Sequence, residues 1–389
     1  MASASNPAKA KVGRAHRVRG FWTRVTEGLE IEQLWGQFKS EARATYGLYS
    51  KDVDWEAIGR EKKRWKRPFL AAWALFLAML MKLSPARRVL LLVAVFLLVA
   101  QIDVHSDHGS ASFNLGWLGA LILFLLLALE LGDRVTMKRD LEIAREIQQW
   151  LVPARPPVVA GIDMAFATRP QNTVAGDYYD AFVRPASAGD SISHPLLVVV
   201  ADVAGKSVPA ALLMATFQAS LRALSATPAT LDEIVVGLDR YCRAHSLDGR
   251  RFTTAFLAEI DPGTREMRYV NAGHNAPILR RASGAIERLE AGGPPFGLPL
   301  FTESEIPYPS GSAQLQAGDL LFVFTDGVAE AVSESGDEYT EQRLIACLQS
   351  AATGTAAEIL HRAMADVNAF AAQARQHDDI TCLALRVNA

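Results

Sequence analysis

The chain has 389 residues, half of them hydrophobic, and a formal net charge of −2 at pH 7. That length allows one large domain with an appendage, or two domains. Residues 1–67 carry 15 Lys and Arg against 8 Asp and Glu, without the aromatic interleaving of a nucleic-acid platform, so we expect no nucleic-acid partner. Three cysteines without CxxC spacing argue against a disulfide framework or a zinc site, and no signal peptide is evident.

Apolar runs follow the basic N-terminal arm, residues 1–67. A membrane-spanning helix needs roughly 20 mostly apolar residues. We therefore expect a membrane region over 68–132, with two spans at about 87–102 and 114–132 and an interfacial or re-entrant helix at 69–81. The alternatives are three full spans, or buried helices of a soluble bundle.

The basic residues around these runs predict an orientation. Lys82 and Arg87 precede the first expected span and Arg134 follows the second, whereas residues 103–112 contain no Lys or Arg. The positive-inside rule places that loop outside and both chain ends in the cytoplasm. The sequence thus predicts a multi-pass protein of the inner (cytoplasmic) membrane, with the lipid bilayer as a partner and any catalytic domain facing the cytoplasm.

Residues 133–152 form a polar segment without Gly or Pro, which predicts a helical linker. Its apolar stripe consists of Leu141, Ala144, Ile147 and Leu151, spaced three or four apart. Such a helix either docks on its own domain or joins two copies into a homodimer as a coiled coil. Fewer than three clear heptads leave both interpretations open.

From residue 153 to the end, β-branched runs alternate with turns, and segments of helical periodicity are grouped among them. This order predicts an α+β domain over 153–389, with sheets packed inside helices. The expected helices cover 210–224, 231–246, 341–350 and 356–374. The expected strands cover 163–168, 178–184, 195–201, 252–260, 267–271, 277–281, 285–289, 320–325 and 380–387.

Aspartates stand at the ends of several expected strands. Asp202 and Asp326 each follow an apolar run, whereas Asp177 and the pair Asp378-Asp379 each precede a strand. A carboxylate fixed at a strand end suits a hard cation, because Mg²⁺ and Mn²⁺ take oxygen ligands and need few carboxylates. One such aspartate is more often a turn residue. Four of them in one domain predict a carboxylate-rich divalent metal site.

Residues from about 141 to the end resemble the metal-dependent PPM (protein phosphatase 2C-like) phosphatases of the bacterial SpoIIE/RsbU branch. The order and spacing of the matching motifs agree over roughly 240 residues. They are Ile143-Ala-Arg-Glu-Ile-Gln148 with Leu151-Val-Pro153, Gly176-Asp-Tyr-Tyr-Asp180, Ala201-Asp-Val-Ala-Gly-Lys-Ser207 and its continuation to Ala215, Phe252-Thr-Thr254, Asn271-Ala-Gly-His-Asn275, Gly292-Gly-Pro-Pro-Phe-Gly297, Phe324-Thr-Asp-Gly-Val328 and Asp378-Asp-Ile-Thr381.

The resemblance implies an αββα sandwich that holds two Mn²⁺ or Mg²⁺ ions. In that arrangement Asp202 bridges both metals, and the Val203 carbonyl completes the first site. Asp326 and Asp378 bind the second metal, with Asp379 as a less certain ligand, and Asp177 holds waters of the first. Ser207 departs from the glycine that relatives commonly have after Gly-Lys.

These ligands imply a protein serine/threonine phosphatase that uses metal-activated water and forms no covalent enzyme intermediate. By resemblance, the substrate is a phosphorylated STAS-type anti-sigma-factor antagonist in a bacterial partner-switching pathway. The alternative is a catalytically weak membrane-tethered scaffold that binds the phosphorylated partner. Lys206 could attract the phosphorylated loop or be merely solvated, and His274 could act as a general acid or be a structural turn residue.

Overall fold

The computed structural model describes residues 50, 53–60, 64–106, 109–185, 194–246, 249–298, 308–351 and 354–388. Chain contacts divide the molecule into two compact units, Met1–Arg134 and Val135–Ala389, and each is described by itself. Most of the predicted basic N-terminal arm lies outside the described residues.

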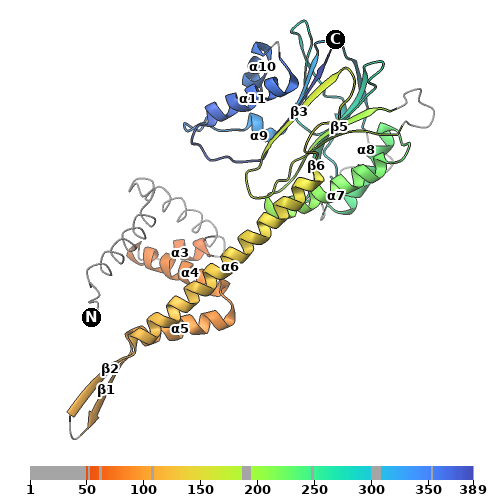
Figure 1. The fold of residues 1–389 in the computed structure, drawn as a ribbon. Helices are drawn as coiled ribbons and strands as arrows, with labels where there is room; N and C mark the ends of the chain where they lie inside the picture. The colour runs from red at the N-terminus through yellow and green to blue at the C-terminus, as the bar shows by residue number, and fades with distance from the viewer. Residues whose placement is uncertain are drawn as a thin grey trace, which may run out of the picture. The chain divides into compact units, whose positions relative to one another are not determined.

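The first unit consists of short helices and one β-hairpin (Figure 1). Pro68 and Pro85 stand in the first turns of α4 and α5, where the missing N–H costs no hydrogen bond. The hairpin contains residues of the predicted outside loop. The elements are α3 (Trp55–Arg60), a 3-10 turn (Arg64–Lys66), α4 (Arg67–Lys82), α5 (Pro85–Val99), β1 (Gln101–Ser106), β2 (Gly109–Asn114) and the start of α6 (Gly116–Leu151).

The predicted membrane hairpin is not supported. Within the described parts of the chain, every helix falls short of the length or the apolar character needed to cross a bilayer. The 16 residues of α4 and 15 residues of α5 extend about 24 and 22 Å, against a hydrocarbon core of about 30 Å. In α6, Glu130 and Asp133 interrupt the apolar part. This finding overturns the predicted localisation as a multi-pass inner-membrane protein, and the lipid partner is not supported.

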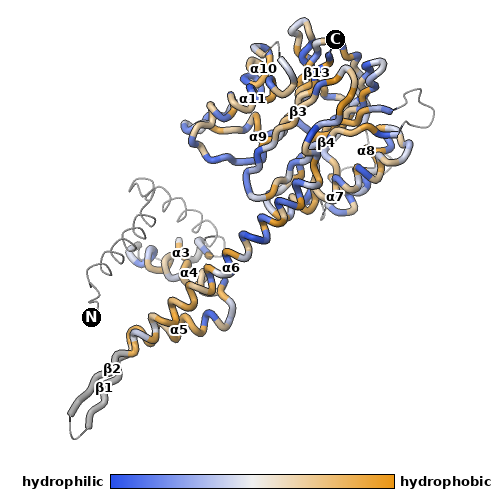
Figure 2. Tube along the Cα trace, in the orientation of Figure 1, coloured by the Kyte–Doolittle hydropathy of each residue, from blue (hydrophilic) through white to orange (hydrophobic). Residues whose placement is uncertain are grey.

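The second predicted span and the predicted linker are one continuous helix, α6, of 36 residues. No proline interrupts it, and the helix ends at Leu151, just before Pro153. Figure 2 shows its hydropathy changing from apolar near its start to polar further along. The helix therefore begins at Gly116, well before the predicted linker, and ends at Leu151.

The second unit contains two β-sheets that pack face to face. Except for the parallel pair of β10 and β7, neighbouring strands are antiparallel. The first sheet has the order β10-β7-β6-β5-β4, with β11 also on β7, and the second has the order β3-β13-β12-β8-β9. The strands are β3 (Ile162–Arg169), β4 (Tyr178–Val183), β5 (Leu196–Val203), β6 (Thr253–Ile260), β7 (Glu266–Ala272), β8 (Ile278–Arg280), β9 (Ile286–Arg288), β10 (Gly292–Gly293), β11 (Gly311–Gln314), β12 (Leu320–Phe324) and β13 (Ile380–Val387).

Strand β5 has apolar side chains on both faces of the first sheet, and both faces are buried. Leu196, Val198 and Val200 point into the apolar layer between the two sheets. Leu197, Val199 and Ala201 alternate with them and point into a second apolar layer, beneath helices. An uninterrupted apolar strand is therefore the sequence signature of a strand at the centre of a layered core.

Helices cover the outer face of each sheet, which completes an αββα sandwich (Figure 1). Helices α7 (Ser207–Ser225) and α8 (Leu231–Ala244) pack on the first sheet. Helices α9 (Asp326–Ala329), α10 (Glu341–Ser350) and α11 (Ala356–Ala371) pack on the second. Capping boxes start α8 and α11, at Thr230 with Glu233 and at Thr355 with Glu358. The predicted fold class of this domain is confirmed.

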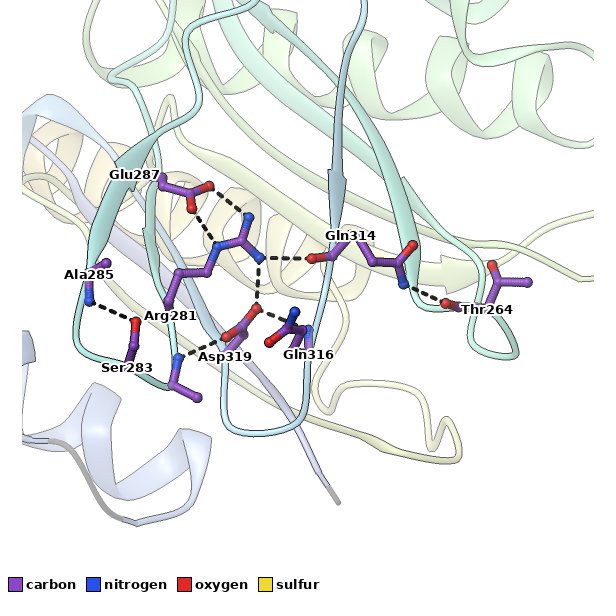
Figure 3. A network of polar contacts seen from close by, with 9 residues as sticks. Thr264, Arg281, Ser283, Ala285, Glu287, Gln314, Gln316 and Asp319 are labelled. Carbon is purple, nitrogen blue, oxygen red and sulfur yellow. Dashed lines mark hydrogen bonds and ion pairs between the residues drawn. The ribbon is translucent and has the colours of Figure 1, made fainter.

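A polar network closes the end of the sandwich at which β12 begins (Figure 3). Arg281 donates to Glu287 through two nitrogens, at 2.6 and 2.7 Å, and to the buried Asp319 at 2.8 Å. Asp319 also accepts the backbone N–H groups of Ala282 and Gln316. Each charge in this network, here called the far-end network, has an opposite charge beside it.

Candidate metal centre

The predicted site aspartates meet at the opposite end of the sandwich. Because β4 and β5 are antiparallel, with Tyr178 opposite Ala201, Asp177 before β4 lies beside Asp202 near the end of β5. Strands β12 and β13 are antiparallel as well, which brings Asp326 after β12 near Asp378 before β13. We call Asp177, Asp202, Asp326 and Asp378 the carboxylate cluster.

Asp177 is buried and held by a hydroxyl from the second sheet. The Thr325 Oγ1 hydroxyl donates to Asp177 Oδ2 at 3.0 Å, and the Thr381 N–H donates to Thr325 Oγ1 at 3.0 Å. Burial, followed by the charge of Asp202, raises the pKa of Asp177 well above its usual range. A carboxylate buried in this way needs a proton or a cation.

The pKa values of Asp202 and Asp326 are raised as well. Burial raises the pKa of Asp202 to about 7, and the charges of Asp326 and Asp378 contribute further. Burial and then Asp378 also raise the pKa of Asp326. Strongly raised pKa values in a group of acids are typical of functional sites that bind a cation or exchange a proton.

The backbone carbonyl of Val203 belongs to the same place. A Cβ atom on Gly176 would lie 3.0 Å from the Val203 carbonyl oxygen and 3.6 Å from Asp202 Oδ1. The glycine before Asp177 therefore lets its loop approach these two oxygens. The structure thus places the Val203 carbonyl beside the carboxylate cluster.

The neighbouring acids Asp378 and Asp379 have different surroundings. Both Asp379 oxygens accept backbone N–H groups of the loop before Asp177, from Gln171 at 2.6 Å and from Gly176 at 2.7 Å. The Asp378 side chain is 34% exposed and forms an ion pair with Lys206 at 3.0 Å. Asp378 Oδ1 also accepts the Asp379 N–H, at 2.9 Å. Asp378 is thus the more exposed acid of the pair, and Asp379 holds the Asp177 loop.

Lys206 and Ser207 lie at the start of α7, next to the cluster. Besides its ion pair with Asp378, the Lys206 ammonium donates to the His377 carbonyl oxygen. Ser207 has a φ of 62°, in the left-handed region that favours glycine. The departure from glycine at this position therefore introduces local backbone strain.

His274 is buried, and its Nδ1 shares a hydrogen bond of 3.0 Å with Thr254 Oγ1. Thr254 stands opposite Asp202 in the pairing of β6 with β5. Burial lowers the pKa of His274 to about 4, so the ring is neutral at physiological pH. A neutral imidazole does not supply a proton as a general acid, which favours the interpretation as a structural residue.

Three further residues support the cluster and were not singled out from the sequence. Gln148 of α6 clasps Ala175, since its Nε2 donates to the Ala175 carbonyl at 2.7 Å and its Oε1 accepts the Ala175 N–H at 3.0 Å. Thr325 and Thr381 orient Asp177. All three lie inside the quoted motifs, but the motifs alone do not distinguish a supporting hydrogen bond from a ligand.

The oxygen donors of the cluster suit a hard divalent cation, although they do not surround one completely. In the described part of the chain, no three His, Cys, Asp or Glu side chains are arranged to hold a metal ion by themselves. Mg²⁺ and Mn²⁺ tolerate this, because they retain several waters and are held by few carboxylates. Three carboxylates with raised pKa values, the Asp378 carboxylate and one backbone carbonyl are oxygen donors of the required type.

Comparison with known families identifies the domain. The family model described as Stage II sporulation protein E (SpoIIE) matches residues 193–388, which is half of the chain. The chain belongs to the SpoIIE family. The prediction of a PPM-type domain from the SpoIIE/RsbU branch is confirmed for the part after the first unit, and a membrane anchor is not supported.

Two curated relatives resemble this SpoIIE-family chain. It is 27% identical over 318 residues to Protein IcfG of Synechocystis sp., covering 74% of this chain and 48% of IcfG. It is 27% identical over 258 residues to phosphoserine phosphatase RsbU of Bacillus subtilis, covering 66% of this chain and 72% of RsbU. The chain thus spans about half of IcfG. RsbU carries the name of a phosphoserine phosphatase, which is the enzyme class predicted from the sequence.

Solved structures agree with the fold. The SiaA-PP2C domain of Pseudomonas aeruginosa aligns with a TM-score of 0.56 and 20% identity, covering 66% of this chain and 99% of that domain. Two others that align, at TM-scores of 0.43 and 0.42 and identities of 18% and 16%, are RsbX in complex with magnesium and PstP in complex with 2 manganese ions. They cover 60% and 59% of this chain and 99% and 100% of their own.

Proposed function

We propose that the unit Val135–Ala389 is a metal-dependent phosphatase that hydrolyses phosphoserine or phosphothreonine in a regulatory protein. The observation that carries the proposal is the carboxylate cluster at one end of the sandwich, in which burial and then neighbouring charges raise the pKa values of Asp177, Asp202 and Asp326. Membership of the SpoIIE family and the likeness to RsbU support it.

In this proposal Asp202 and the Val203 carbonyl bind the first of two Mn²⁺ or Mg²⁺ ions, and Asp326 with Asp378 bind the second. Asp177 orients waters of the first ion while Thr325 holds its carboxylate. When bound, the ions supply a nucleophilic water and neutralise charge on the transferring phosphoryl group. Asp379 is a positioning residue, because its oxygens are occupied by backbone N–H groups.

The proposed substrate is a phosphorylated STAS-type antagonist of an anti-sigma factor, which would place the protein in a partner-switching pathway. This substrate class is proposed because the chain resembles RsbU over 258 residues. Proposed with it are a helical linker over 133–152, a phosphatase domain over 153–389, and a homodimer formed through the linker.

The test measures phosphate release from a phosphoserine peptide and from a phosphorylated STAS protein, using the full chain. We expect release with Mn²⁺ or Mg²⁺, none with EDTA, and none from the Asp202→Asn variant. The matched control is Asp232→Asn, which changes a half-exposed aspartate at the first turn of α8. Metal-independent release would contradict the proposal. Binding of the phosphoprotein without release would favour the alternative of a signalling scaffold.

A further inference from the structure

A cavity lies beside the carboxylate cluster. It has a volume of about 140 Å³ and is formed by the loop before β13, the start of α7 and the region of α9. It shares Lys206 and Asp378 with the site already described. The volume fits one side chain or a small anion, so the cavity is a subsite for a group next to the reacting phosphate rather than for a whole ligand.

The ionisable side chains around this cavity are mostly cationic. The cations are Arg169, Lys206 and Arg375, joined by His377, and the anions are Glu330 and Asp378. If Asp378 is engaged as a metal ligand, three permanent cations face Glu330 alone. The cavity then attracts anions, and we call it the cationic pocket.

Two of these groups are free to bind a ligand. Arg375 and His377 are exposed, and neither side chain hydrogen-bonds or pairs with any residue that the structure describes. Arg169 is anchored, because its Nη1 donates to Asn368 Oδ1, while its Nε is buried and has no partner in the described chain. An unsatisfied buried donor at a cavity wall is costly unless a ligand or water accepts from it.

The loop that carries Arg375 and His377 is held in place. Gln376 Nε2 donates to the carbonyl oxygens of Arg169 and Asp378, at 2.7 Å each. Gln171 Nε2 donates to the Gln376 carbonyl at 3.3 Å. These contacts tie the loop to the end of β3 and to the loop of Asp177, so the cations keep a defined position relative to the cluster.

We propose that the cationic pocket binds the carboxylate of an Asp or Glu close to the phosphorylated residue of the protein substrate. This inference rests on the proposed function and adds a substrate preference to it. The pocket adjoins the proposed metal ligand Asp378, so an anion bound there is a near neighbour of the phosphoryl group. Guanidinium groups match a planar carboxylate through paired N–H donors.

The test compares phosphoserine peptides that carry Glu, Ala or Lys at the positions flanking the phosphoserine. For the full chain with Mn²⁺, we expect kcat/KM to be highest for the Glu peptides, mainly through a lower KM. Arg375→Glu should shift the ratio of kcat/KM for Glu over Lys peptides by about tenfold toward Lys, since it replaces an attraction by a repulsion. The matched control is Arg362→Glu, an exposed arginine of α11 away from the cationic pocket, which should leave the ratio unchanged.

The outcomes separate this inference from the proposed function. Hydrolysis of all peptides with no preference between Glu and Lys would overturn the subsite but leave the phosphatase intact. An equal loss for all peptides in Arg375→Glu would assign the cationic pocket to the phosphoryl group or to free phosphate, and would also overturn the inference. No hydrolysis of any peptide would instead contradict the proposed function.

Discussion

Both ends of the β-sandwich contain buried acidic side chains, but the charges next to these side chains differ. In the far-end network, Asp319 and Glu287 share the guanidinium of Arg281. In the carboxylate cluster, Asp177, Asp202 and Asp326 lie among other acids, and Lys206 pairs with Asp378.

The pKa values record this difference. Hydrogen bonding to Arg281 lowers the pKa of Glu287, whereas burial raises the pKa of Asp202 to about 7. A buried charge with a partner can support the fold, while buried like charges oppose it. The far end therefore stabilises the sandwich, and the cluster end stores electrostatic repulsion that a bound cation would relieve.

The largest expected effect comes from removing the central acid. Asp202→Asn should reduce kcat/KM for a phosphopeptide by about 10³-fold or more, because it removes a proposed metal ligand. The same variant should raise the melting temperature in EDTA at pH 8, since one of several repelling charges is gone. Enzyme assays and calorimetry measure both. A lower melting temperature of the variant in EDTA would show that Asp202 stabilises the fold. It would contradict the stated difference between the two ends of the sandwich.

The next effect comes from the far end. Arg281→Met removes the guanidinium that hydrogen-bonds to the buried Asp319, and the free energy of unfolding should fall by about 2–3 kcal/mol. Denaturant titration measures this loss. Metal affinity and kcat/KM of the folded protein should not change, because Arg281 lies at the other end of β12. A loss of metal affinity in this variant would show that the two ends are coupled.

A smaller effect is expected from the clasp between α6 and the Asp177 loop. Gln148→Ala removes two hydrogen bonds to Ala175, and the affinity for Mn²⁺ should fall by about tenfold. Calorimetric titration of the metal measures it. Gln149→Ala is the matched control, because this neighbouring side chain is exposed. Equal Mn²⁺ affinities of wild type and Gln148→Ala would show that this contact does not affect metal binding at the carboxylate cluster.

The last effect concerns pH. The folded pKa of Asp202, about 7, lies above its unfolded value of about 3.8. Its ionisation therefore costs stability progressively as the pH rises from about 4 to about 7, and no further cost follows above that. The metal-free melting temperatures of wild type and Asp202→Asn should diverge over this interval. Taking the difference removes the contribution of His274, whose lowered pKa increases stability as the pH rises from about 4 to 6.5. A constant difference would contradict the raised pKa.

Local patterns predicted most of the second unit. The helices α8 and α10 begin at the expected residues, and β13 matches its expected range, because apolar periodicity and capping residues are local signals. The short elements β10, β11 and α9 were missed. Two to four residues carry too little periodicity to distinguish a strand or a turn of helix from a loop.

The predicted membrane hairpin shows that apolar composition alone does not predict a membrane-spanning helix. Apolar runs near residues 69–81 and 87–102 suggested a bilayer, but the helices that form there have 16 and 15 residues. Hydropathy reports which residues avoid water, whereas spanning a membrane also depends on the length of uninterrupted helix. The length was decided by where prolines and the β1–β2 hairpin end each helix.

By itself, the sequence determined the α+β class and the four strand-end aspartates, because alternating apolar residues and strand-end carboxylates are local features. The αββα arrangement was implied by the resemblance of the motifs to a known family. Only the tertiary structure separated Asp378 from Asp379, placed Gln148 on the Asp177 loop and gathered Arg169, Lys206 and Arg375 around one pocket. Those decisions depend on which backbone groups and charges come together from distant parts of the chain. Spacing along the sequence contains no information on distances that the packing of two sheets creates.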